Sequence, residues 1–126
     1  MKNLSLKHVR YAAETVLAYV LYGFFWVLPV ETASTLGGLM MKKIGPRTKM
    51  DNVARQNLRR AFPEKSMDDI EAIVAGMWDN LGRVLAEYPH LRRIGRTMEV
   101  VGHQYLDAVR DSGKPAIFFA AHLANW

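Results

Sequence analysis

The sequence predicts an α/β protein whose N-terminal part is rich in helix, and three observations support this fold class. The 126-residue chain is half apolar and 23% charged, a composition that can bury a core. In its middle part the apolar residues recur every three to four positions, which is the period of a helix. Residues 115–121 instead form an unbroken apolar run, which is typical of a strand buried on both faces. We therefore expect a membrane-anchor helix, amphipathic helices, and then the first strand, helix and strand of a sheet.

Composition excludes some chemistry. The chain has no cysteine, which rules out disulfides, thiol nucleophiles and zinc knuckles. Its net charge of +5 favours anionic partners, which could be nucleic acid, lipid headgroups or an acidic protein.

The first expected element is an anchor over residues 11–30. This stretch carries one charge, Glu14, and none from residue 16 onward. As a helix the uncharged part rises about 22 Å, against about 30 Å for a hydrocarbon core, so a tilted transmembrane helix, a monotopic anchor and a soluble core helix all remain open. The basic residues before it would suit a signal peptide, but no convincing cleavage site follows, and we expect a retained anchor.

A basic block follows the anchor and contains two expected helices. Between residues 42 and 60 seven basic residues stand against one acid, Asp51, and this excess favours a cytoplasmic location for the block. A short helix over residues 32–43 should end at Gly45-Pro46. A second helix, from near Asp51 to Phe62, should end at Pro63 and carry three candidate substrate- or headgroup-binding residues: Arg55, Arg59 and Arg60. A solvated charged face and a nucleic-acid contact are the alternatives.

The most regular helical pattern spans residues 67–88. Ser66 is a suitable N-cap, two acids occupy the first turn, and Pro89 follows the last position. We expect Trp78 to lie in the core, because a stripe of large apolar side chains at helical spacing needs no ligand to explain it.

The last expected elements are a strand over residues 97–101, a helix over residues 104–112 and a strand over residues 115–121. Two strands with apolar faces cannot form a finished layer, so the chain looks truncated. The expected domains are an anchor with its following short helix over residues 1–45, and the N-terminal part of a catalytic domain over residues 46–126.

His122 is the candidate catalytic residue. It stands just past the carboxyl end of the last expected strand, where ligands and reacting groups gather in open α/β sheets. The other three histidines, His8, His90 and His103, are expected to be surface or capping groups.

Four ordered motifs resemble the lipid A biosynthesis acyltransferase family, which contains lauroyl and myristoyl transferases. They are Asn57-Leu58-Arg59-Arg60-Ala61-Phe62-Pro63, Gly76-Met77-Trp78-Asp79-Asn80-Leu81-Gly82-Arg83, Glu87-Tyr88-Pro89 and His122-Leu123-Ala124-Asn125-Trp126.

The resemblance implies transfer of a fatty acyl chain from acyl carrier protein to a hydroxyl of a phosphorylated lipid A precursor, at the inner membrane, with the catalytic part facing the cytoplasm. In the family the histidine is followed after four residues by an acid, so His122 matches the general base and Asn125 and Trp126 flank the motif. The acid would stand one residue beyond Trp126, and we therefore expect this chain on its own to be inactive. No cofactor and no metal is expected.

Two other interpretations remain open at this point. The acceptor could be another glycolipid or a lysophospholipid, because related members acylate such lipids. The chain could also be a membrane-anchored binding piece without catalysis. A soluble nucleic-acid binder is disfavoured by the apolar stretch beside the basic block, and we expect no nucleic-acid partner.

Overall fold

The computed structural model describes residues 6–119, and in this range all regular secondary structure is helical. The chain divides into two compact units, one up to His90 and one from Leu91 onward. The first unit contains α1 (Leu6–Trp26), α2 (Val30–Ile44), the 3-10 turn η1 (Gly45–Arg47), α3 (Lys49–Ala61), α4 (Met67–Glu87) and the 3-10 turn η2 (Tyr88–His90). The second contains α5 (Leu91–Thr97) and α6 (His103–Asp111).

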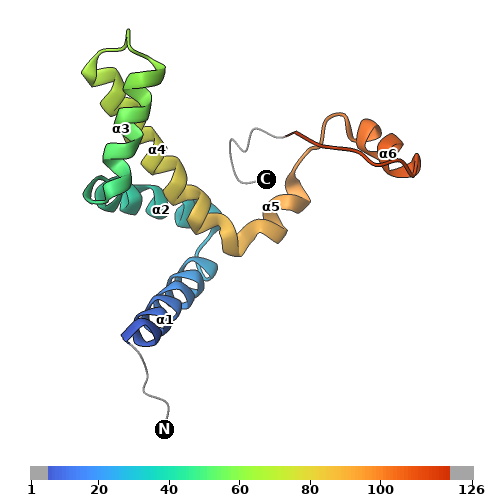
Figure 1. Ribbon diagram of the computed structural model, residues 1–126. Coiled ribbons are helices and arrows are strands. Elements are labelled where there is room, and N and C mark those ends of the chain that lie inside the picture. The colour runs from blue at the N-terminus through green and yellow to red at the C-terminus, as the bar shows by residue number, and fades with distance from the viewer. Residues whose placement is uncertain (1–5, 120–126) are drawn as a thin grey trace. The chain divides into compact units, whose positions relative to one another are not determined.

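Helix α4 is the central element of the first unit, and α2 and α3 follow one another along it (Figure 1). Gly37 of α2 meets Gly82 of α4, and Arg55 of α3 bonds Glu71 of α4, so both shorter helices run antiparallel to the long one. The break between them is Gly45-Pro46, as the sequence predicts, because proline cannot continue the backbone ladder of α2. Apart from α1, this unit is a helical hairpin. Its first half consists of α2 and α3, separated by η1, and its second half is α4.

The predicted helix over residues 67–88 is confirmed as α4. Ser66 Oγ accepts from the Asp69 backbone N–H at 3.1 Å, and the Asp69 carboxylate accepts from the Ser66 backbone N–H at 3.2 Å. This reciprocal capping box satisfies two backbone donors that the first helical turn would otherwise leave unpaired.

Two small apolar clusters hold the first unit together. One contains Phe25, Ala33 and Ala86, and joins the end of α1 to α2 and α4. The other contains Ile70, Val74 and Trp78 of α4, against which α2 and α3 pack partly buried side chains. Trp78 is 4% exposed, which confirms its predicted place in the core.

Glycine allows α2 and α4 to touch backbone to backbone. A Cβ added at Gly37 or at Gly82 would overlap the other glycine's carbonyl oxygen. Gly45 likewise lies directly under the indole ring of Trp78, where a side chain would have no room. Gly37, Gly45 and Gly82 therefore have a packing role.

The α/β prediction is wrong for the described residues, because neither expected strand forms there. Residues 98–100 and 114–119 have no regular secondary structure, and residues 120–121 lie outside the described range. Ile117, Phe118 and Phe119 are between 65% and 95% exposed. A strand depends on a neighbour for its backbone hydrogen bonds and for burial of its side chains, and residues 6–119 supply none to these segments. The second unit is formed by α5, which the sequence pattern did not indicate, and by α6, which confirms the predicted helix over 104–112.

The predicted membrane-anchor helix is also wrong as a membrane-spanning helix. Among the described residues, no helix combines the length and the apolar character needed to cross a membrane. The apolar stretch over residues 11–30 is divided, because α1 ends at Trp26 and α2 begins after Pro29. The residues of α1 beyond its last charge, 15–26, rise only about 18 Å.

Candidate functional site

The structure places the predicted site residues in two groups. His122, Asn125 and Trp126 lie outside the described residues. Arg55, Arg59 and Arg60 all lie on α3, but their surroundings differ. The geometry on α3 therefore separates a structural arginine from two arginines that face solvent.

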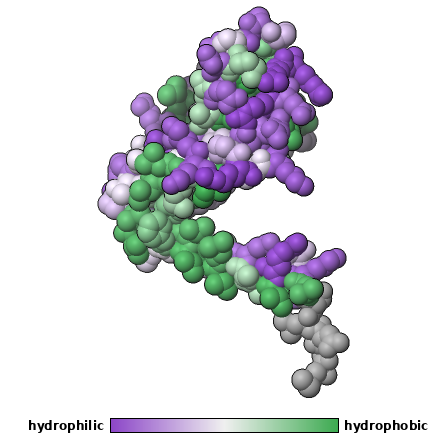
Figure 2. All heavy atoms as spheres, turned by 90° about the vertical axis from the view of Figure 1, so that its left-hand side faces the viewer, coloured by the Kyte–Doolittle hydropathy of each residue, from purple (hydrophilic) through white to green (hydrophobic). Residues whose placement is uncertain are grey.

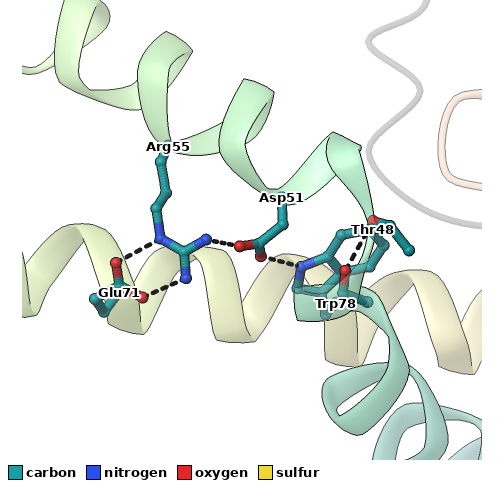
Figure 3. A network of polar contacts seen from close by, with 6 residues as sticks. Thr48, Asp51, Arg55, Glu71 and Trp78 are labelled. Atoms are coloured by element: carbon teal, nitrogen blue, oxygen red, sulfur yellow. Dashed lines mark hydrogen bonds and ion pairs between the residues drawn. The ribbon is translucent and has the colours of Figure 1, made fainter.

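Arg55 bridges α3 to α4 (Figure 3). Its Nε and Nη2 donate to the two carboxylate oxygens of Glu71, each at 2.6 Å, which is the bidentate arrangement that suits a guanidinium. Its Nη1 is paired with the carboxylate of Asp51, one turn earlier on α3. Because Glu71 and Asp51 occupy both edges of the guanidinium, Arg55 has no free pair of N–H groups with which to bind a phosphate.

Asp51 connects this pair to the core. Its side chain is buried, and its Oδ1 accepts from the indole Nε1 of Trp78 at 2.8 Å. A buried indole N–H needs an acceptor, and Asp51 supplies one while Arg55 balances its charge. Glu71, Arg55, Asp51 and Trp78 form a continuous polar chain between two helices, which we call the α3–α4 clamp.

The charges of the clamp reinforce one another. The hydrogen bond from Arg55 lowers the pKa of Glu71, and the hydrogen bond to Glu71 raises the pKa of Arg55. A comparable pair joins Asp79 and Arg83 one turn apart on α4, where the hydrogen bond from Arg83 lowers the pKa of Asp79. Both arginines thus stabilise neighbouring carboxylates of the helical hairpin.

Arg59 and Arg60 are exposed at the C-terminal end of α3. Arg59 Nη2 lies 3.1 Å from Met67 Sδ, a weak acceptor, and within residues 6–119 Arg60 has no hydrogen-bond or ion-pair partner. These two cations are available to an external anion, and their role in binding stays a prediction.

The histidines other than His122 have structural or surface positions. His90 is buried, and its Nε2 lies 2.9 Å from the Phe25 carbonyl oxygen in the last turn of α1. His90 therefore caps the end of α1. Of the two roles predicted for it, the capping role is correct and the surface role is not. His8 and His103 are exposed on α1 and α6.

The clamp partners of Arg55 were not predicted from the sequence. Two signals could have indicated them: Asp51 is the single acid inside a basic block, and Trp78 is a core tryptophan whose N–H needs an acceptor. Neither signal gives the spatial neighbour, because Asp51 and Trp78 are 27 positions apart.

Comparison with known proteins gives one match. A family model of bacterial lipid A biosynthesis acyltransferases matches residues 2–126, almost the whole chain. No curated protein and no solved structure matches the chain. The family match covers the glycine- and tryptophan-containing segment of α4, the basic helix α3 and the segment that contains His122, and the chain belongs to the bacterial lipid A biosynthesis acyltransferase family.

Proposed function

We propose that the protein transfers a fatty acyl chain from acyl carrier protein to a hydroxyl of a phosphorylated lipid A precursor at the cytoplasmic face of the bacterial inner membrane. The observation that carries this proposal is the family match over residues 2–126, which supports an acyltransferase. Acyl carrier protein as donor, the phosphorylated glycolipid as acceptor and His122 as base are the finer parts of the proposal.

His122 would act as the general base. Its imidazole takes the proton from the acceptor hydroxyl as that oxygen attacks the thioester carbonyl, and the carrier thiolate leaves when the tetrahedral intermediate collapses. The histidine then returns the proton to the thiolate. An unperturbed imidazole titrates near pH 6.5, which suits this exchange at neutral pH.

The experiment replaces His122 and compares the variant with a matched one. Acyl transfer from acyl carrier protein to a phosphorylated glycolipid is measured for the full-length protein that the cell expresses, for its His122→Ala variant and for its His103→Ala variant. His103 is exposed on α6. We expect His122→Ala to lose about 10²- to 10⁴-fold in rate, because positioned proton transfer contributes that much, and His103→Ala to keep the parent rate. Equal rates in the two variants would overturn the assignment of His122.

Arg59 and Arg60 are proposed to contact an anionic partner. Both are exposed on the end of α3, and the coulombic effect of Arg59 reaches Glu71 and lowers its pKa beside the larger effects of Arg55. The phosphates of the acceptor and the acidic surface of the carrier protein are both complementary to them.

Charge reversal at these two positions shows which of the two partners the arginines bind. Arg59→Glu with Arg60→Glu is titrated with acyl carrier protein and, separately, with vesicles that contain the phosphorylated glycolipid. Arg55 is left intact, because its replacement would disturb the clamp. Loss of affinity for one titrant identifies the partner, whereas unchanged affinity for both means that the two arginines are only a solvated face.

A further inference from the structure

The first unit contains an apolar groove. It lies between α1, α2 and the α4–η2 segment, and its volume is about 370 Å³. None of its lining residues carries a charge, and they include Leu21, Phe25, Met40, Met41, Ile44 and Leu85. Figure 2 shows the apolar residues gathered toward α1 and the hydrophilic residues covering the end of the unit that carries α3.

The groove is a consequence of how the helices meet. Gly37 and Gly82 bring the α2 and α4 backbones into contact, so no side chain fills the space beside their crossing. His90 binds the Phe25 carbonyl and fixes the C-terminal end of α1 on the other side. The space is therefore held open by the backbone of three helices and does not depend on one flexible loop.

The chemistry of the lining favours a hydrocarbon chain. A ligand with many polar groups would lose their hydration and gain few partners, since the walls are mainly aliphatic, thioether and aromatic and the side-chain polar groups among them are the hydroxyls of Tyr22 and Tyr88. Two methionines give part of the wall the adaptability to fit a flexible chain. A second hollow of about 300 Å³ on α1 shares Ala18 and Tyr22 with the groove, which extends the apolar surface along the helix and suits a long, thin ligand.

The charge at one end of the groove indicates an anionic headgroup. The last turn of α2, which contributes Ile44 to the lining, also carries Lys42 and Lys43, and both are exposed. Arg47 follows and donates to the Lys43 carbonyl, which keeps a third cation near this end. Long basic side chains at the edge of an apolar surface can reach a phosphate while their methylenes remain on hydrocarbon.

We propose that this groove binds one acyl chain of an anionic membrane phospholipid, with the headgroup phosphate near the last turn of α2. The bound lipid is not a reactant. The groove is formed by residues of the first unit alone. This proposal does not rest on the proposed acyl transfer, so either proposal can fail alone.

The test uses a matched pair of substitutions on α1. Ala18→Trp places an indole in the groove, whereas Ala13→Trp places the same side chain on an exposed position that lines neither hollow. Both variants gain the same apolar surface, so nonspecific partition into lipid changes equally. Circular dichroism checks that both keep the parent helix content. The probe is lauroyl lysophosphatidylglycerol below its critical micelle concentration, titrated into the full chain by calorimetry.

We expect saturable binding of one probe molecule per chain. Ala18→Trp should weaken it about tenfold, because two displaced methylenes account for roughly that factor, and Ala13→Trp should bind as the parent does. The zwitterionic lysophosphatidylcholine of the same chain length should bind more weakly than the anionic probe, and glycerol phosphate should not bind. Equal affinities of the two variants, binding without saturation, or equal affinity for the zwitterionic probe would each overturn the proposal.

Discussion

The buried carboxylate of Asp51 connects three parts of the first unit. It accepts from Trp78 and pairs with Arg55, so one side chain joins the core, the basic helix and α4. Two small apolar clusters provide only a modest stabilisation of the fold. Fully paired polar groups between the helices therefore help to specify how the helices pack.

We expect Asp51→Ala to lower the free energy of unfolding by about 3 kcal/mol, because it leaves a buried indole N–H without an acceptor and removes one of the two carboxylates that pair with Arg55. Urea denaturation followed by circular dichroism measures the change. Asn52→Ala is the control, since Asn52 is the exposed neighbour on the same helix and its replacement should cost at most about 0.5 kcal/mol. Equal losses would mean that the clamp contributes nothing specific.

The lowered pKa of Glu71 predicts a dependence of stability on pH. A carboxyl whose pKa is lower in the folded than in the unfolded protein stabilises the fold above its unfolded value of about 4.3, and this contribution disappears as the pH falls through the folded pKa. Glu71→Gln should therefore be less stable than the parent near neutral pH, and the difference should shrink as the pH falls through the folded pKa of Glu71. Thermal unfolding across this range tests it, and a constant difference would contradict the assignment.

The structural role of a residue could be predicted from the sequence where that role depends on neighbours in the chain. The N-cap Ser66 and the core Trp78 follow from the sequence, because a cap and a helical stripe are both set by near neighbours. Arg55 could not be told from Arg59 and Arg60, because its partner Glu71 lies on another helix. The candidate site was predicted as three equivalent arginines, and the structure distinguishes one of them.

At the scale of elements, the crossing of α2 and α4 sets the geometry of the first unit. Gly37 and Gly82 allow a contact that no other residue pair would allow, and the groove lies beside it. Helix α4 also contains Gly76, which has open space around it.

We expect Gly82→Ala to lower the free energy of unfolding by about 3 kcal/mol, because the added methyl group forces the two backbones apart. Gly76→Ala should raise it by up to about 1 kcal/mol, because alanine is the better helix former at an open position. Chemical denaturation of both variants tests the prediction. A similar effect of the two substitutions would show that the helices are not in backbone contact.

Elements could be predicted well where a helix has both a pattern and terminal signals. Helix α4 has a cap, a stripe and a following proline, and it forms nearly as expected. The prediction of a membrane-spanning anchor failed because the uncharged stretch runs through Pro29, where a second helix begins. The strand predictions failed because an apolar run predicts burial but cannot supply the strand that would pair with it.

At the scale of the whole molecule, both apolar clusters belong to residues of the first unit. A chain limited to residues 1–90 should therefore keep the helical circular dichroism of this unit and a cooperative thermal transition. Loss of the transition would mean that residues beyond His90 are needed to complete the core.

Membership of the acyltransferase family supports acyl-transfer chemistry, and the helices of the first unit supply a basic face on α3 and an apolar groove at α1. The sequence alone indicated the chemistry, because the motifs are short and ordered. It did not indicate the groove, which depends on how three helices meet.

The most direct test of the central claim is the mass of the lipid product. The full-length protein that the cell expresses, rather than residues 1–126 alone, is incubated with acyl carrier protein that bears one fatty acyl chain. A phosphorylated lipid A precursor and a lysophospholipid are both present in equal amounts. We predict that the glycolipid gains the mass of one acyl group in place of a hydrogen and that the lysophospholipid is unchanged. Acylation of the lysophospholipid alone, or of neither lipid, would contradict the proposed function.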